Sequence, residues 1–336
     1  MLNSRNSSWI FLAFLIALLL RTLFTSRSVI MDFLTVPLLS VFVLPTLSAY
    51  SSRLNLLFFY MSWTTLVMSL SDVRIEMVGT LMVRLIFWII PSCIFFLFDS
   101  IAPNTAANLK EGGEAGLPSG SRRHRASAYI FQIPGICLAN FVLSVLLQLG
   151  WEKTLNYLRF QPAVQVTIAV PMPWGIANHL FWGFLLREIL SYGVHRFVLH
   201  SNQPGLDWIA NWHDNWFHSL RGPLPLTAHY DHPVPYILHN FLPMYIPVHY
   251  FRFHMITYII YMVIISIEET FTYSGYCVLP ISLLQGAASR VGGHLSSDGR
   301  KYFGRIGLAD LVMGTGEFLG GLVGGDSGGN DHRRRR

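Results

Sequence analysis

Residues 176–200 read IANHLFWGFLLREILSYGVHRFVLH, an apolar run that ends in two histidines, His195 and His200. Two further histidine-containing segments follow, WHDNWFH at 212–218 and AHYDHP at 228–233. Imidazole is a common metal ligand, and ionisable residues at a membrane boundary are costly unless they serve a function. The pattern therefore predicts a metal centre just outside a lipid bilayer, placed to act on a lipid-like molecule.

The composition is that of a membrane protein. Of 336 residues, 52% are hydrophobic and only 12% are charged, about half the charged share of an ordinary soluble domain. The net charge of +6 comes largely from basic clusters beside apolar segments, such as Arg122–Arg125 and Arg333–Arg336. Clusters in that position are explained by membrane topology and anionic lipid headgroups, and they do not indicate nucleic-acid binding.

The apolar segments predict an all-α, polytopic helical membrane protein. Each is close to the roughly 20 residues that a helix needs to cross the hydrocarbon core. Proline residues and a Tyr-Phe-Arg sequence interrupt the last segment, which we read as a hairpin. The predicted spans are 9–24, 29–47, 54–70, 83–101, 128–149 and 176–192, with the hairpin at 236–267.

The segment 103–127 separates two halves of the chain. It is rich in Gly, Ser and charge, and its basic residues outnumber its acidic ones, which favours the cytoplasmic side. Counting spans from this linker places every histidine segment on that same side, as a cytoplasmic-face histidine-rich metal-binding cap. The predicted domains are an N-terminal transmembrane half of about four spans (1–102), a cytoplasmic linker (103–127), a histidine-containing membrane domain (128–318) and a disordered basic tail (319–336).

The spacing of the histidines leaves their arrangement open. Side chains five residues apart, such as His195 and His200, lie about 140° apart on a regular α-helix. Either they serve two ions, or the helix loosens as it leaves the bilayer. Taken one at a time, such histidines are more often structural than metal ligands. The sequence contains no HExxH, CxxC or Glu-x-x-His pattern, which argues against a zinc protease, a zinc finger and a soluble di-iron bundle.

The order of the motifs resembles the fatty acid hydroxylase and sterol desaturase superfamily of membrane di-metal oxygenases, in particular a fungal-type branch. HRFVLH at 195–200 resembles the first histidine box, WHDNWFH the second, and AHYDHP the His-Pro element that follows. EETFTYSGYCVLP at 268–280 resembles the segment that usually reads His-Ser-Gly-Tyr. His294 and the sequence from Asp310 to Gly314-Thr315 resemble the third box and its closing signature. The likeness extends over about 181–315.

The chain departs from this pattern at both the second and the third box. Phe217 and Ser219 flank a single His218, Tyr273 stands where a histidine is frequent, and Ser297 and Asp298 replace a histidine pair. Glu268 or Glu269 offers a further carboxylate or, equally, an ion pair with Arg252 or Arg290. The metal ligands that the resemblance implies are His195, His200, His213, His218, His229, His232 and His294, with Asp298 as a replacement carboxylate.

The resemblance implies two iron ions that activate O2 to hydroxylate or desaturate a lipid, a sterol or another apolar metabolite. It also implies residence in the endoplasmic reticulum and electrons from cytochrome b5 and its reductase. Because the sequence contains no CxxCH haem motif and no GxGxxG loop that opens a helix, the donor would be a separate protein. The alternative is a metal-depleted or non-oxidative relative, either a lipid-binding partner or an isomerase. A transporter is the least favoured reading.

Overall fold

Helices form every regular element in the part of the chain that the computed structural model describes, and two isolated β-bridges complete it. That part comprises residues 52–110, 112–118, 126–201, 203–220, 222–276, 282–297 and 299–316. The predicted spans at 9–24 and 29–47, the basic tail and Asp298 lie outside the described residues. The prediction of an all-helical membrane protein is confirmed for the rest.

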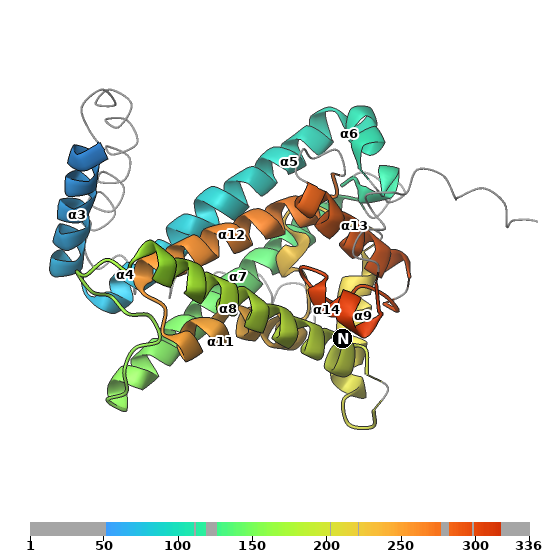
Figure 1. The fold of residues 1–336 in the computed structure, drawn as a ribbon. Helices are drawn as coiled ribbons and strands as arrows, with labels where there is room; N and C mark the ends of the chain where they lie inside the picture. The colour runs from blue at the N-terminus through green and yellow to red at the C-terminus, as the bar shows by residue number, and fades with distance from the viewer. Residues whose placement is uncertain are drawn as a thin grey trace, which may run out of the picture.

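Three helices are long and apolar enough to cross a membrane: Asp72–Ile101, Gln132–Tyr157 and Met255–Ser274. The first consists of α4 (Asp72–Arg84), a π turn η1 (Leu85–Ile89) and α5 (Ile90–Ile101). The second is most of α7 (Ala126–Tyr157), and the third is α12 (Met255–Ser274). In Figure 1, α5 and α12 run along one another across the molecule.

The first of these helices begins well before the predicted start at residue 83. The charged residues Arg74 and Glu76 precede the predicted span in the sequence, but Glu76 is buried, as is Arg84 within that span. Arg84 forms a salt bridge with Glu269 of α12, and Glu76 accepts a hydrogen bond from Gln148 of α7. Burial of charged groups is tolerated where they are paired and hydrogen-bonded.

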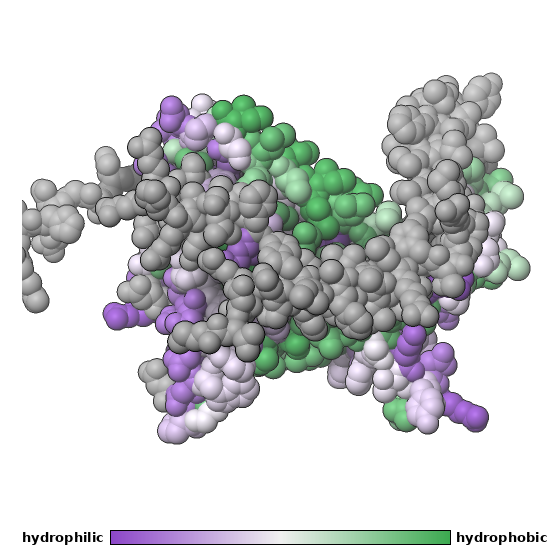
Figure 2. Space-filling view, turned by 180° about the vertical axis from the view of Figure 1, so that it is seen from behind, coloured by the Kyte–Doolittle hydropathy of each residue, from purple (hydrophilic) through white to green (hydrophobic). Residues whose placement is uncertain are grey.

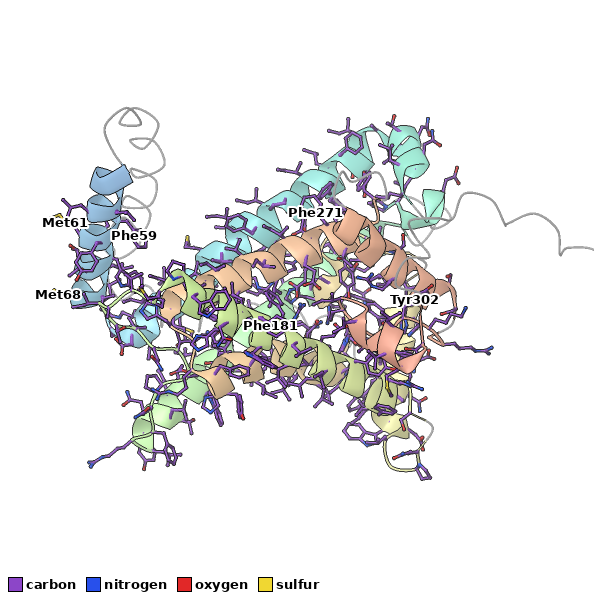
Figure 3. The ribbon with its side chains drawn as sticks, viewed as in Figure 1. Phe59, Met61, Met68, Phe181, Phe271 and Tyr302 are labelled. Carbon is purple, nitrogen blue, oxygen red and sulfur yellow. The ribbon has the colours of Figure 1, made fainter. Side chains whose placement is uncertain are left out.

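Helix α3 (Ser52–Ser69) covers the predicted span 54–70, and its apolar part, Leu56–Ser69, is shorter than the three candidate spans. Its Phe59, Met61 and Met68 are exposed, and Figure 3 shows Met61 and Met68 on the outer side of the helix. The exposed apolar side chains of η1 and α5 form a hydrophobic flank that is visible in Figure 2. A lipid-facing surface is expected to have this composition.

Helix α8 (Pro173–Val194) covers the apolar run that precedes His195 and packs against α12 and α11 (Leu242–Phe251). The predicted hairpin at 236–267 turns at Arg252, which has a left-handed backbone conformation with φ of 50° and ends α11. The chain approaches this hairpin through α10 (Pro233–Tyr236) and a π turn, η6 (Ile237–Phe241). The fold thus places the end of α8 beside the C-terminal half of α12.

Short elements gather at that end of the bundle. They are the π turn η3 (His195–Leu199), α9 (Asp207–Trp216), η4 (Phe217–Ser219), η5 (Thr227–His229), α13 (Ser282–Ser296) and α14 (Leu308–Met313). The first part of the predicted linker also folds against the bundle, as α6 (Pro103–Leu109) and η2 (Gly113–Gly116). Its Lys110 forms a buried salt bridge with Asp99 of α5.

Candidate metal centre

The end of α8 widens into a π turn at the first histidine segment. The backbone N–H of His200 donates to the carbonyl oxygen of His195 over 3.1 Å, an i→i+5 hydrogen bond. Because a π turn contains more residues than an α turn, residues five apart come closer to one face. The two ring centroids are 5.0 Å apart. Of the two arrangements that the spacing left open, the structure has the loosened helix, a device that is frequent at functional sites.

Four histidines from distant parts of the sequence converge at this turn. His195 and His200 come from η3 and its end, His213 from α9 and His294 from α13. One ring nitrogen from each lies within 4.8 Å of those of the others. This spacing suits a single bound ion, because ligand nitrogens around a common metal sit about 2 Å from it.

Three of these rings are oriented by hydrogen bonds at Nδ1. His195 Nδ1 lies 3.0 Å from the carbonyl oxygen of Phe303, and His294 Nδ1 lies 2.7 Å from that of Lys301. His213 Nδ1 lies 2.6 Å from the carboxylate of Asp231. Each acceptor holds the proton on Nδ1 and leaves the lone pair on Nε2, as is usual for metal-binding histidines. All three Nε2 atoms are buried, with no hydrogen-bond partner among the described residues.

Three histidines of this group have lowered pKa values, which favours the neutral form that binds a metal cation. Burial lowers the pKa of His195 well below its usual value, and the neighbouring imidazoles lower it further. The same causes lower the pKa of His200 to about 2, and burial lowers that of His294 to about 3. These rings are therefore neutral near pH 7, the state that ligates a metal.

His218 lies beside this group. Its Nε2 atom is 3.4 Å from Nε2 of His200, and its ring centroid is 4.9 Å from that of His294. His239, which the sequence analysis did not include, also lies against the group, with its ring centroid 4.4 Å from that of His195. No spacing connects His239 to the histidine segments, and only the η6 turn of the folded chain brings it there.

The structure places two other predicted ligands elsewhere. His229 lies between the Tyr236 hydroxyl, 2.7 Å from its Nδ1, and Glu269, 3.4 Å from its Nε2. His232 accepts a hydrogen bond from Val234 N at the start of α10 and stacks on Trp212 with ring centroids 4.1 Å apart. Asp231, which the sequence analysis missed, lies between them. A carboxylate beside a predicted ligand is a signal for such an orienting partner.

The loop after α13 is held by Asp310, which fixes the acceptor of His195. Its carboxylate accepts hydrogen bonds from Phe303 N at 2.8 Å, Gly304 N at 2.7 Å and the Thr315 hydroxyl at 2.7 Å. Because the N–H of Gly304 and the carbonyl group of Phe303 belong to the same peptide plane, the hydrogen bond from Gly304 N to Asp310 keeps that carbonyl oxygen directed toward His195. The closing Asp-x3-Gly-Thr sequence therefore has a structural role in orienting the histidines.

Glu188 of α8 holds the next part of the same loop. Its carboxylate accepts from Ile306 N at 2.8 Å, Gly307 N at 3.0 Å and Ala309 N at 3.3 Å. A Cβ atom at Gly304 would lie 2.5 Å from Oε1 of Glu188, so the loop passes close to this carboxylate. A charged residue in an apolar helix is thus explained by backbone partners, and it joins α8 to the loop that positions the metal group.

Comparison with known families agrees with this geometry. Residues 180–315 match the sequence model of the family described as fatty acid hydroxylase. The chain contains a fatty acid hydroxylase family domain. No solved structure matches the chain. A domain of this family implies an oxidoreductase of the hydroxylase type, a lipid substrate and the use of iron.

Within the hydroxylase-family domain, both acidic residues of α12 form ion pairs. Glu268 pairs with Arg187 of α8 at 2.7 Å, and Glu269 pairs with Arg84 of α4. The sequence suggested Arg252 or Arg290 as partners, but in the structure the partners are Arg187 and Arg84. Each pair joins α12 to a different neighbouring helix. Both carboxylates also line the cavity that contains the histidines.

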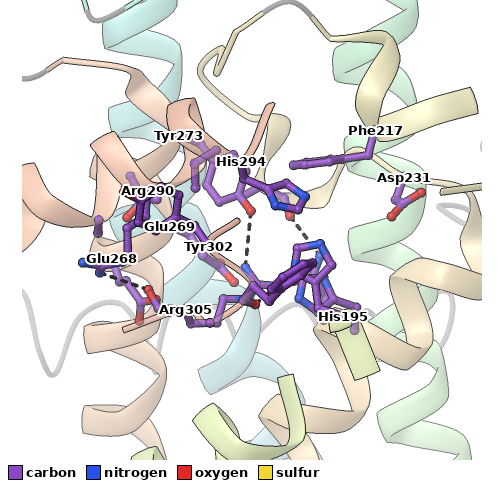
Figure 4. Close-up of a pocket in the computed structure, with 18 of the residues that line it drawn as sticks. His195, Phe217, Asp231, Glu268, Glu269, Tyr273, Arg290, His294, Tyr302 and Arg305 are labelled. Carbon is purple, nitrogen blue, oxygen red and sulfur yellow. Dashed lines mark hydrogen bonds between the residues drawn. The ribbon is translucent and has the colours of Figure 1, made fainter. Parts of the chain in front are cut away.

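Two cavities meet at this point. A small one of about 40 Å³ is lined by His195, His213, His239 and His294, and Figure 4 shows His195 and His294 facing the same space. A larger one of about 530 Å³ opens between α8 and α12, with an almost entirely apolar lining that includes Phe184, Leu185 and Ile264. Four residues line both cavities: Glu268, Ala287, Arg290 and Arg305.

Proposed function

We propose that this chain is a membrane-bound, non-haem iron oxygenase that hydroxylates or desaturates a lipid, sterol-like or other apolar substrate. The observation that supports it best is the convergence of four imidazoles within 4.8 Å in a fatty acid hydroxylase family domain. Three of them direct buried, unpartnered Nε2 atoms toward the shared space. An apolar core would not stabilise such atoms, whereas a bound cation would.

The proposed ligands are His195, His200, His213 and His294, with His218 beside them. When bound, iron supplies O2 activation, because imidazole ligands leave coordination positions open. The chain supplies neutral rings whose direction is fixed from behind by Asp231 and by two backbone carbonyl groups. In this arrangement His229 and His232 support the surrounding structure. Asp298 stays a predicted ligand.

The apolar cavity between α8 and α12 is the proposed substrate chamber. Its volume of about 530 Å³ falls within the range of roughly 300–1,000 Å³ that is common for small-molecule sites. Phe181, at its outer edge, is 61% exposed on the surface of α8, which would let an apolar molecule enter from the bilayer. Figure 3 shows this side chain. The shared lining residues place the inner end of the chamber beside the histidines.

Electrons are proposed to come from a separate protein, cytochrome b5 with its reductase, at the cytoplasmic face of the endoplasmic reticulum. This part of the proposal rests on family membership and on the predicted topology, in which the histidine segments and the basic clusters share one side. The short elements that enclose the histidines lie at one end of the helical bundle, where a soluble donor could approach (Figure 1).

The test is product analysis of the purified, iron-loaded chain with O2, an electron donor and a panel of apolar substrates. We expect His195→Ala and His213→Ala to abolish product formation. His179→Ala is a matched control, because His179 also lies on α8 but stacks on Phe253 away from the metal group. A chain that binds lipid but retains no iron and forms no oxidised product would support the alternative, a lipid-binding partner or isomerase.

A further inference from the structure

We infer that the centre holds one metal ion, and that the guanidinium of Arg305 occupies the adjacent space that a second ion would need. The inference rests on the proposed function and concerns the composition of the same site. It departs from the two-ion expectation that the family resemblance gave, and it is carried by the contacts of this chain's own residues.

The number of side chains able to hold a metal ion is the first observation behind this inference. Among the described residues, one group of His, Cys, Asp and Glu side chains has ligand atoms close enough to share an ion, and it consists of four histidines. His229 is engaged with Tyr236 and Glu269, and His232 with Val234 and Trp212. Four imidazoles, with His218 beside them, are sufficient for one ion. A second ion would need a comparable set, and the structure directs His229 and His232 to other partners.

Arg305 contacts side chains that line the cavity of the histidines. Its guanidinium donates to the side-chain oxygen of Asn240, and its Nη1 lies 3.5 Å from the Tyr273 hydroxyl. Its Nη2 lies 3.5 Å from Nδ1 of His239, whose ring adjoins that of His195. Figure 4 shows Arg305 among the residues that line the same cavity as His195. Arginine stays charged, so a second cation in this cavity would face a like charge at short range.

The contact with Arg305 determines the tautomer of His239. Its Nδ1 atom faces a guanidinium, which can only donate, so the neutral ring carries its proton on Nε2. The Nε2 atom therefore presents an N–H to the cavity. This is the opposite of His195, His213 and His294, which present a lone pair.

Two aromatic side chains also line the cavity that contains the histidines. Phe217 and Tyr273 stand where the resemblance led us to expect histidines, and both line the same cavity. Phe217 stacks on His213 with an interplanar angle of 12° and covers that ring with an apolar face. Tyr273 is buried and directs its hydroxyl toward Arg305. A phenyl group, a phenol and a guanidinium, none of which is a metal ligand, thus line the cavity together with His195.

Metal stoichiometry tests this inference without any measurement of activity. The full chain, purified in detergent and stripped of metal, would be titrated with Fe(II) under anaerobic conditions, desalted and analysed for iron. We expect about one ion per chain. Two ions per chain would overturn the single-ion inference and leave the proposed function intact, whereas no retained iron would overturn both. Magnetic resonance of the Co(II)-loaded chain should show an isolated ion with no coupled partner.

A gain-of-site variant tests the role of Arg305. Phe217→His, Tyr273→His and Arg305→Met together restore two imidazoles and remove the positive charge, so a second ion should bind. The matched control carries the same two histidines with Arg290→Met, because Arg290 also lines both cavities and donates to the carbonyl oxygen of Arg305, whereas Arg305 itself faces His239. This control should still bind one ion. Equal stoichiometry in the two triple variants would show that Arg305 does not exclude the second ion. If the triple variants fail to fold, the stoichiometry of the unaltered chain decides the inference.

Discussion

Gly299 lies directly against the ring of His200: a Cβ atom at position 299 would be 2.3 Å from Cε1 of that ring. The backbone N–H of Gly299 also donates to the carbonyl oxygen of His294 over 3.1 Å. The turn at the end of α13 thus carries one proposed ligand and forms the wall behind another. Glycine is required there for space, and also because φ is +70°.

Gly299→Ala should displace the His200 ring and weaken metal retention by at least about tenfold, the loss that is common when a ligand is misplaced. Gly314→Ala is the matched control. Gly314 has a similar φ of +65°, but its added Cβ would meet nothing within 4 Å. Metal analysis of both variants separates backbone strain from the steric effect on His200. Equal metal loss in the two would contradict the specific role of Gly299.

Asp231→Asn should lower metal affinity by about 10- to 100-fold, because the orienting carboxylate of His213 becomes neutral. The ring would keep a hydrogen-bond acceptor, so the fold should be retained. Asp214→Asn is the control, because Asp214 lies next to His213 on α9 but is exposed. Competition with a chelator of known affinity measures both variants. An Asp231→Asn affinity equal to that of the control would remove the proposed orienting role.

Leu185→Trp should fill part of the cavity between α8 and α12 and obstruct the proposed substrate. We expect turnover of long apolar substrates to fall about tenfold or more, with iron content unchanged, because the substitution lies in the chamber and not at the metal group. Ile94→Trp adds the same bulk at a 61% exposed position on α5 and should leave turnover unchanged. Equal turnover in both variants would place the substrate elsewhere.

His254 should make stability depend on pH at the start of α12. Its Nδ1 accepts from Ile256 N at 3.2 Å, and its Nε2 lies 3.2 Å from the carbonyl oxygen of Thr167, so the neutral ring fits both partners. Burial lowers its pKa below the usual value near 6.5. The unfolded chain therefore binds more protons than the folded one below about pH 6.5, and folding stability falls as the pH drops into that range, by up to about 1.4 kcal/mol per pH unit.

The matched variant for this prediction is His254→Asn, which retains an N-cap acceptor but does not titrate. Chemical unfolding in detergent at pH 8 and pH 5.5 should show a smaller loss of stability for the variant than for the unaltered chain. Parallel losses would show that His254 contributes nothing to the pH dependence.

The sequence predicted the parts of this fold that depend on local patterns. Apolar length predicted the helices that are long and apolar enough to cross a membrane, and histidine density predicted the segments of three of the four grouped histidines, because both signals lie within short segments. The start of the span predicted at 83–101 was wrong by eleven residues, since Glu76 precedes the apolar run and its partner Gln148 lies on α7. His239 was missed for the same reason. Its role depends on a contact between η6 and η3 that no local spacing reveals.

The same distinction between local patterns and contacts of distant segments applies to the site residues. Sequence order could select candidate ligands, but not decide which of them share an ion. The structure groups His195, His200, His213 and His294, and it gives His229 to an ion pair and His232 to a helix start. Asp310 and Glu188 act through backbone N–H groups, and these contacts become visible only when the loop and α8 are placed together.

The π turn between His195 and His200 has a consequence for how this segment tolerates changes in length. Deleting one residue from 196–199 would leave the two histidines four apart, and an ordinary α-helical turn would then present both on one face. A deletion at this position thus converts one helical geometry into another without separating the pair. Related chains with either spacing can therefore build the same pair of rings from different lengths of backbone.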